Sequence, residues 1–111
     1  MNLKPVVRRT RADQDVREAI YYYVEQQAPD AALAFVTGLE QAIRHIQRHP
    51  ASGSPRYAHA LDLPGLRFWS CKRFPYLVFY VERPDHIDVW RILQAQRDIP
   101  AWLLADDVNA D

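Results

Sequence analysis

Basic and aromatic residues alternate along the C-terminal half of the chain, in a combination that can contact anionic partners. The basic residues are Arg67, Lys72, Arg73, Arg91 and Arg97, and the aromatic residues among them are Trp69, Tyr76, Tyr80 and Trp90. Guanidinium groups bind carboxylates and phosphates, and Trp, Tyr and Arg dominate many interfaces. The pattern indicates either a surface for nucleic acid or protein, or solvated positions on the open face of a half-buried sheet.

Arg91 stands between Trp90 and Ile92 in an otherwise apolar segment. A cation in such a segment is costly unless it is paired or faces solvent. We therefore expect Arg91 either to contact a partner or to form a salt bridge with an acid such as Asp88 or Asp98.

Residues of the kinds used in catalysis and metal binding are few. The chain has no Gly-rich phosphate loop and no Cys-x-x-Cys pair. His45 and His49 are four residues apart on one predicted helix face, but no acidic third ligand shares that face, and cations at a helix C-terminus complement its dipole. Cys71 is expected to be a buried structural residue. We expect no metal, no cofactor and no catalytic residue.

The bulk properties are those of one ordinary globular domain, which we assign to residues 1–111. The formal net charge is zero, so no direct DNA binding driven by a general positive field is expected. The single cysteine fits a reducing compartment. No apolar run approaches the ~18 residues that span a bilayer. We expect a cytoplasmic protein without membrane contact.

Hydrophobic periodicity and turn residues predict the elements that position these side chains. A strand over Leu3–Val7 precedes a helical hairpin at about 10–49, with Thr10 and Asp30 as caps and Pro29 at the turn. A loop at 50–65 leads to a three-strand meander at 66–94 and a C-terminal helix at about 98–105. The strands of the meander are Leu66–Arg73, Tyr76–Glu82 and His86–Leu93, and the short turns between them require antiparallel neighbours. The predicted fold is α+β, in the order β-α-α-β-β-β(-α), with the hairpin on one face of a small antiparallel sheet.

Several spaced motifs resemble the ParE toxins of the RelE/ParE superfamily. They are GLR at Gly65–Arg67, FPYLVFYV at Phe74–Val81, IDVWRILQAQRDIPAWL at Ile87–Leu103, DVREAIYYY at Asp15–Tyr23, and the HP of His49-Pro50 followed by Gly53. The resemblance covers essentially all of residues 3–104. It implies the toxin of a bacterial type II toxin–antitoxin system, held inactive by a ParD-like antitoxin in a heterotetramer or larger complex.

Two activities occur among toxins of this superfamily. ParE-like members poison DNA gyrase, whereas RelE-like members are ribosome-dependent mRNA endonucleases. RelE-like nucleases place an arginine directly after the tyrosine that opens the strand, where this chain has Leu77, and several relatives have a histidine where this chain has Gln94. Glutamine exchanges no proton near neutral pH. The resemblance therefore implies a gyrase inhibitor that binds without catalysis. The alternatives are a RelE-like nuclease and a non-toxic RNA- or protein-binding module.

Two sets of candidate contact residues follow. For the target they are Arg67, Lys72, Arg73, Tyr76, Arg91, Arg97 and Trp102. For an amphipathic or extended antitoxin segment they are Tyr21, Tyr22, Leu33, Phe35 and Leu39. Consecutive residues on a helix are about 100° apart, so Tyr21, Tyr22 and Tyr23 cannot all face the sheet.

Overall fold

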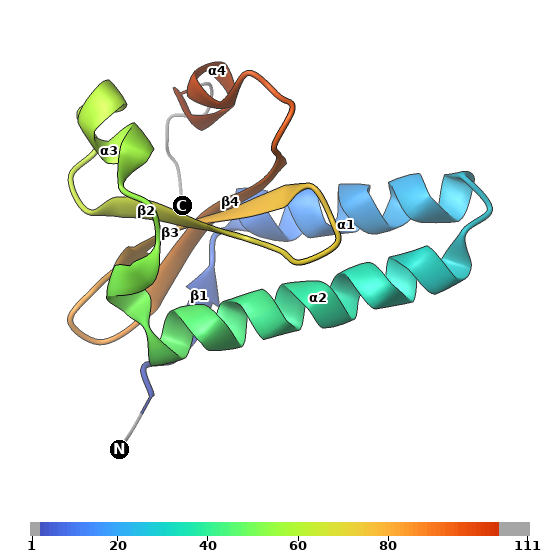
Figure 1. Ribbon diagram of the computed structural model, residues 1–111, viewed down its shortest axis with the longest axis horizontal. Coiled ribbons are helices and arrows are strands. Elements are labelled where there is room, and N and C mark those ends of the chain that lie inside the picture. Colours follow the sequence, from blue (N-terminus) through green and yellow to red (C-terminus); the bar gives the residue numbers. More distant parts are fainter. Residues whose placement is uncertain (1–2, 105–111) are drawn as a thin grey trace.

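The computed structural model describes residues 3–104 and confirms the α+β class (Figure 1). Its elements are β1 (Val6–Arg8), α1 (Thr10–Glu25), α2 (Pro29–Arg48), the 3-10 helix η1 (Pro50–Ser52), α3 (Arg56–Leu61), β2 (Leu66–Ser70), β3 (Tyr76–Glu82), β4 (Ile87–Gln94) and α4 (Ile99–Leu104). Helices α1 and α2 form the predicted hairpin on one face of the sheet, and α3 and α4 lie on the other. None of the helices in this range has the length and apolar character needed to cross a bilayer.

The sheet is mixed rather than purely antiparallel, which corrects the expectation from the sequence. Its strand order is β1-β4-β3-β2, and β2, β3 and β4 pair antiparallel as the short turns require. The edge strand β1 runs parallel to β4, with Val6 opposite Ile87. No tight turn joins these two strands, because the whole helical hairpin and the meander lie between them, so nothing in the local sequence forces an antiparallel arrangement.

The unbroken apolar run of β3 is explained by cover on both faces of the sheet. Val78 and Tyr80 point into the core beneath α1 and α2, while Phe79 and Val81 point into a second core with Ile99 of α4. Successive residues of a strand face opposite sides, so a strand buried on both sides reads as continuous hydrophobic sequence. The predicted central position of this strand is confirmed.

Local boundaries differ from the sequence expectations at several places. The first strand covers Val6–Arg8 instead of Leu3–Val7, and β2 ends at Ser70 instead of Arg73. Pro29 is the first residue of α2, a position where its missing N–H costs nothing, so Asp30 lies in the first turn instead of capping the helix. Arg9 occupies the N-cap position of α1, and Thr10 is its first residue. The segment expected as a plain loop at 50–65 contains η1 and α3, which are too short to show a helical period.

Gly53 sits where a side chain has no room. A Cβ there would lie 2.4 Å from the Tyr80 hydroxyl and 3.0 Å from the Phe68 carbonyl oxygen. Gly53→Ala should therefore destabilise the protein by about 1–3 kcal/mol. Gly38→Ala is the matched control, because its Cβ would meet its nearest neighbours at 3.6 Å in the middle of α2. That change should stabilise by up to about 1 kcal/mol. Urea denaturation of both variants checks the contrast, and equal effects would contradict it.

Candidate functional site

A buried ion pair joins α1 to β4. Arg91 donates from Nε to Asp15 Oδ2 at 2.8 Å and from a terminal nitrogen to Asp15 Oδ1 at 2.9 Å. Both side chains are 6% exposed. The partner of Arg91 is thus Asp15, and the expectation of Asp88 or Asp98 was wrong. Asp88 instead accepts hydrogen bonds from Arg9, Arg83 and the Trp90 indole.

Asp15 also replaces a missing strand partner. The pairing of β1 with β4 ends opposite Val89. The next residue of β4, Trp90, forms a bulge in the pairing with β3. Two residues after this bulge, the backbone N–H of Ile92 donates to Asp15 Oδ2 at 2.9 Å. The sequence carried a signal for this role, because Asp15 lies on the same buried stripe of α1 as Ala12 and Ala19. A carboxylate on an apolar stripe and an arginine in an apolar strand are a natural buried pair.

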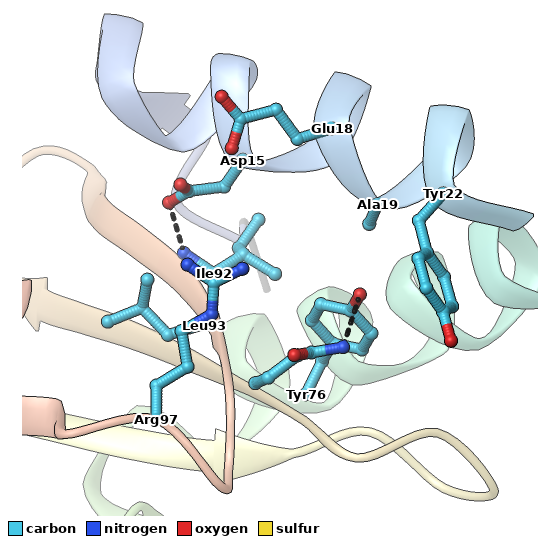
Figure 2. A pocket seen from close by; sticks show the side chains of 9 residues that line it. Asp15, Glu18, Ala19, Tyr22, Tyr76, Ile92, Leu93 and Arg97 are labelled. Atoms are coloured by element: carbon cyan, nitrogen blue, oxygen red, sulfur yellow. Dashed lines mark hydrogen bonds between the residues drawn. The ribbon is translucent and has the colours of Figure 1, made fainter.

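A pocket of about 300 Å³ lies beside this ion pair, between α1 and the end of the sheet. It is lined by Asp15, Glu18, Ala19, Tyr22, Tyr76, Ile92, Leu93, Gln94 and Arg97. Figure 2 shows the α1 side chains along one wall, facing Tyr76 and the β4 residues. We call it the α1–β4 pocket.

The floor of the α1–β4 pocket is built by Tyr76 and Gln94, which are opposite one another on β3 and β4. Gln94 Nε2 donates to the Tyr76 hydroxyl at 3.2 Å. Burial raises the pKa of Tyr76, against smaller lowering effects of the Gln94 hydrogen bond and of Arg97. The phenol is therefore protonated near neutral pH, and its hydroxyl accepts the hydrogen bond from Gln94.

Two arginine side chains contact Trp102 of α4 and so connect the rim of the α1–β4 pocket to this helix. The Arg97 guanidinium lies 4.2 Å from the centre of the Trp102 ring, and the Arg91 guanidinium lies 5.7 Å from it. Arg91 also donates to the Trp102 carbonyl oxygen at 2.9 Å. Tyr76, Arg91, Arg97 and Trp102 are thus brought together, although only Arg97 among them is well exposed.

Lys72 and Arg73 form a second, separate group in the turn between β2 and β3. Both are exposed, and they line a groove of about 430 Å³ against Ala34, Thr37, Gly38, Gln41 and Phe74. Among residues 3–104, no acidic side chain lines this groove. Arg67 belongs to neither group, because it donates to the Gly53 carbonyl oxygen at 2.7 Å and anchors the loop after α2. The seven target candidates therefore do not make one continuous surface.

The antitoxin candidates divide into exposed and buried residues. Tyr21, Tyr22 and Leu33 are 65%, 49% and 69% exposed. Phe35 and Leu39 are 0% and 3% exposed, so as candidate surface contacts they were wrong. They occupy the stripe of α2 that packs on the sheet, where Phe35 contacts Tyr76 with ring centres 4.9 Å apart. Their helical spacing marked them for the core.

Comparison with known proteins places this architecture in a family. The family model described as ParE toxin of type II toxin-antitoxin system, parDE, matches residues 6–99. The chain belongs to the ParE toxin family.

The comparison with solved structures finds a similar chain, whereas the comparison with curated proteins finds no match. A chain described as the chromosomal ParDE TA system from P. aeruginosa superposes with a TM-score of 0.71 at 20% sequence identity, over 85% of this chain and 98% of that chain. At this identity the likeness shows the fold alone. No curated protein matches the sequence.

The two histidines at the end of α2 in this ParE-family chain, His45 and His49, lie next to each other with ring centres 5.2 Å apart. His45 stacks on Trp69 with ring centres 3.8 Å apart, and its Nε2 lies 2.9 Å from the Ser52 hydroxyl. Burial lowers the pKa of His45, and the nearby His49 and Lys72 lower it further. No group of three potential metal ligands occurs within residues 3–104.

The Cys71 thiol should react slowly. It is buried, and burial raises its pKa from 9.0 to about 11. At pH 8 the thiolate fraction is then about 100-fold lower than in the unfolded chain. A thiol-reactive dye should therefore label native protein at least about 100-fold more slowly than protein in urea at the same pH. Because the neutral thiol is the favoured form, its contribution to stability is present below pH 9 and is lost as the pH rises through about 11. Equal labelling rates would contradict the burial.

Proposed function

We propose that the protein is a ParE-type toxin that inhibits DNA gyrase in the cytoplasm and is neutralised by a cognate ParD-like antitoxin. Membership of the ParE toxin family supports the toxin class. The finer assignment of gyrase as target rests on Leu77, where RelE-like nucleases have an arginine, and on Gln94, where several relatives have a histidine.

The α1–β4 pocket is the single observation that carries this proposal. It places Tyr22, a candidate for antitoxin contact, beside Tyr76 and Arg97, candidates for target contact. A segment bound there would cover both sets of groups at once. Neutralisation then follows from occlusion of the target surface, without any change in the fold of the toxin.

The chemistry of the pocket favours binding over strand cleavage. Phosphodiester cleavage needs a general base, a general acid and cations around the scissile phosphate. The Tyr76 phenol has a raised pKa, its neighbour Gln94 cannot exchange a proton, and Arg91 is already paired with Asp15. The remaining cation at the rim, Arg97, is suited to holding a carboxylate of a protein partner.

We further propose a complex of two toxin chains on one antitoxin dimer, or a larger assembly of the same unit. Light scattering of the purified complex gives its mass and tests this stoichiometry.

Expression of the toxin without its antitoxin tests the function. A gyrase inhibitor should arrest growth with induction of the DNA-damage response, and purified toxin should inhibit supercoiling by gyrase. Co-expression of the antitoxin gene next to the toxin gene should restore growth. Rapid loss of translation with cleaved mRNA would instead establish the RelE-like nuclease. Normal growth, with no effect on gyrase or on translation, would favour the non-toxic binding module.

A further inference from the structure

The edge strand β2 is open at Ser70. Cys71 N donates to the Tyr76 carbonyl oxygen at 2.9 Å, so the backbone groups of Cys71 point toward β3. Backbone groups alternate along an antiparallel strand, and those of Ser70 therefore point away from the sheet, as those of Phe68 do. Phe68 is bonded to Ser54 in both directions, at 2.9 and 3.0 Å. Ser70 is exposed, and within residues 3–104 its outward N–H and C=O have no such partner.

The chain before Ser54 turns away and leaves room beside Ser70. Ser54 pairs with Phe68 in an antiparallel bridge, so continued pairing would place Ser52 opposite Ser70. Ser52 instead ends the 3-10 helix η1. A pocket of about 330 Å³ lies here, lined by Ser52, Ser54, Phe68, Trp69 and Ser70. One residue of a further strand therefore has space at this edge.

A cationic groove continues from this edge along α2 to the turn between β2 and β3. It consists of two adjoining pockets of about 460 and 430 Å³, which share Gly38, Gln41 and Lys72. We call them together the α2–β2 groove. The first is also lined by Ser70 and the second by Arg73, and within residues 3–104 neither has an acidic lining residue. Open backbone groups and two cations thus belong to one surface.

The walls of the α2–β2 groove are held together before any partner binds. His45 of α2 stacks on Trp69 of β2 with ring centres 3.8 Å apart, and its Nε2 lies 2.9 Å from the Ser52 hydroxyl. That hydroxyl donates to the His49 carbonyl oxygen at 2.7 Å. These contacts tie α2, η1 and β2 to one another, so little ordering is needed when a partner binds.

The chemistry of this surface fits an acidic peptide better than a nucleic acid. One peptide residue antiparallel to β2 exchanges both backbone hydrogen bonds with Ser70. A phosphodiester backbone offers only acceptors, and would leave the Ser70 carbonyl without a donor. In the antiparallel direction, the residues before the bridging residue extend toward the turn. Carboxylates at those positions would meet Lys72 and Arg73.

We propose that the β2 edge at Ser70 and the α2–β2 groove form a strand-addition site for an acidic, extended segment of the target protein. This assignment rests on the proposed function and adds a mode of target recognition to it. Within the described part of the chain, this surface has no lining residue in common with the α1–β4 pocket. The target is therefore held at a second surface, away from the pocket that the antitoxin covers.

A matched pair of variants tests the backbone contact. Ser70→Pro removes the outward N–H, a change that a strand edge tolerates, whereas Ser70→Ala keeps it. In supercoiling by purified gyrase, the proline variant should need an at least about tenfold higher concentration for half inhibition than the alanine variant. Both should bind the antitoxin equally. Equal inhibition by two folded variants would overturn the assignment, and so would a matching loss of antitoxin affinity, which would give the edge to the antitoxin. If the wild-type toxin does not inhibit gyrase, the proposed function itself fails.

Amide hydrogen exchange on the wild-type toxin gives an answer that does not depend on the folding of a variant. The Ser70 amide should exchange at least about tenfold more slowly with excess gyrase. The Phe68 amide already donates to Ser54 and is the control, which should not change. Unchanged exchange at Ser70, or equal slowing at both amides, would overturn strand addition. Protection of Ser70 by the DNA substrate alone would overturn the peptide in favour of a nucleic acid.

Neutral substitutions test the acidic character of the segment. Lys72→Gln with Arg73→Gln should raise the concentration for half inhibition at least about tenfold, because the carboxylates lose both cations. Arg44→Gln with Arg48→Gln is the control, since these two exposed arginines of α2 do not line the groove. Unchanged inhibition by the first variant, or equal losses in both, would overturn the acidic segment.

Discussion

Replacing Arg91 by alanine is expected to lower the free energy of unfolding by about 3–5 kcal/mol, the largest stability effect of any single substitution considered. The change leaves the Asp15 carboxylate 6% exposed and without the guanidinium that holds both its oxygens. It also removes the hydrogen bond to the Trp102 carbonyl, which helps to hold α4 on the sheet. Urea denaturation followed by tryptophan fluorescence measures the loss.

Two comparisons make this expectation specific to the buried pair. Arg83→Ala breaks a similar contact to Asp88, but the Arg83 side chain is 41% exposed and Arg9 still bonds the same carboxylate, so the loss should stay below about 1 kcal/mol. Arg91→Met combined with Asp15→Asn removes both charges and keeps an acceptor for the Ile92 N–H. That double variant should recover most of the loss. Equal losses for Arg83→Ala and Arg91→Ala would contradict the buried ion pair.

The double substitution of Lys72 and Arg73 by glutamate should abolish inhibition of the target. Both residues are exposed in a turn, and they supply the charge of a groove with no acidic lining. Reversing both charges would repel an acidic surface of the target. Affinity for the antitoxin should stay within about tenfold, or about 1.4 kcal/mol, because the turn lies outside the α1–β4 pocket. Gyrase supercoiling and antitoxin titration measure the two effects.

The control makes the same change in net charge elsewhere. Arg44→Glu with Arg48→Glu alters two exposed arginines of α2 that do not line the groove. It should leave inhibition largely intact. If this control also abolishes inhibition, general charge rather than the turn is responsible. If the Lys72 and Arg73 variant loses antitoxin affinity as strongly as inhibition, the target surface has been put in the wrong place.

The candidate site was only partly predictable, and the reason differs from residue to residue. Residue type alone marked Lys72, Arg73 and Arg97, since charged side chains next to short turns are exposed. Phe35 and Leu39 show the opposite case. Their helical spacing already assigned them to the core, and this evidence outweighs any general preference of partners for apolar residues. The buried stripe of α1 marked Asp15 as a carboxylate in need of a partner, but that partner, Arg91, lies 76 residues away, and local patterns do not identify a partner over such a separation.

The sequence by itself determined the family, the order of the main helices and strands, the helical hairpin and the antiparallel meander. These depend on periodicity and on short turns, which act between residues that are close along the chain. Only the tertiary structure decided the parallel pairing of β1 with β4, the partner of Arg91 and the pocket that gathers Tyr22, Tyr76 and Arg97. Each of these joins segments separated by dozens of residues, so it depends on how the helices cross the sheet and on which charges are buried together.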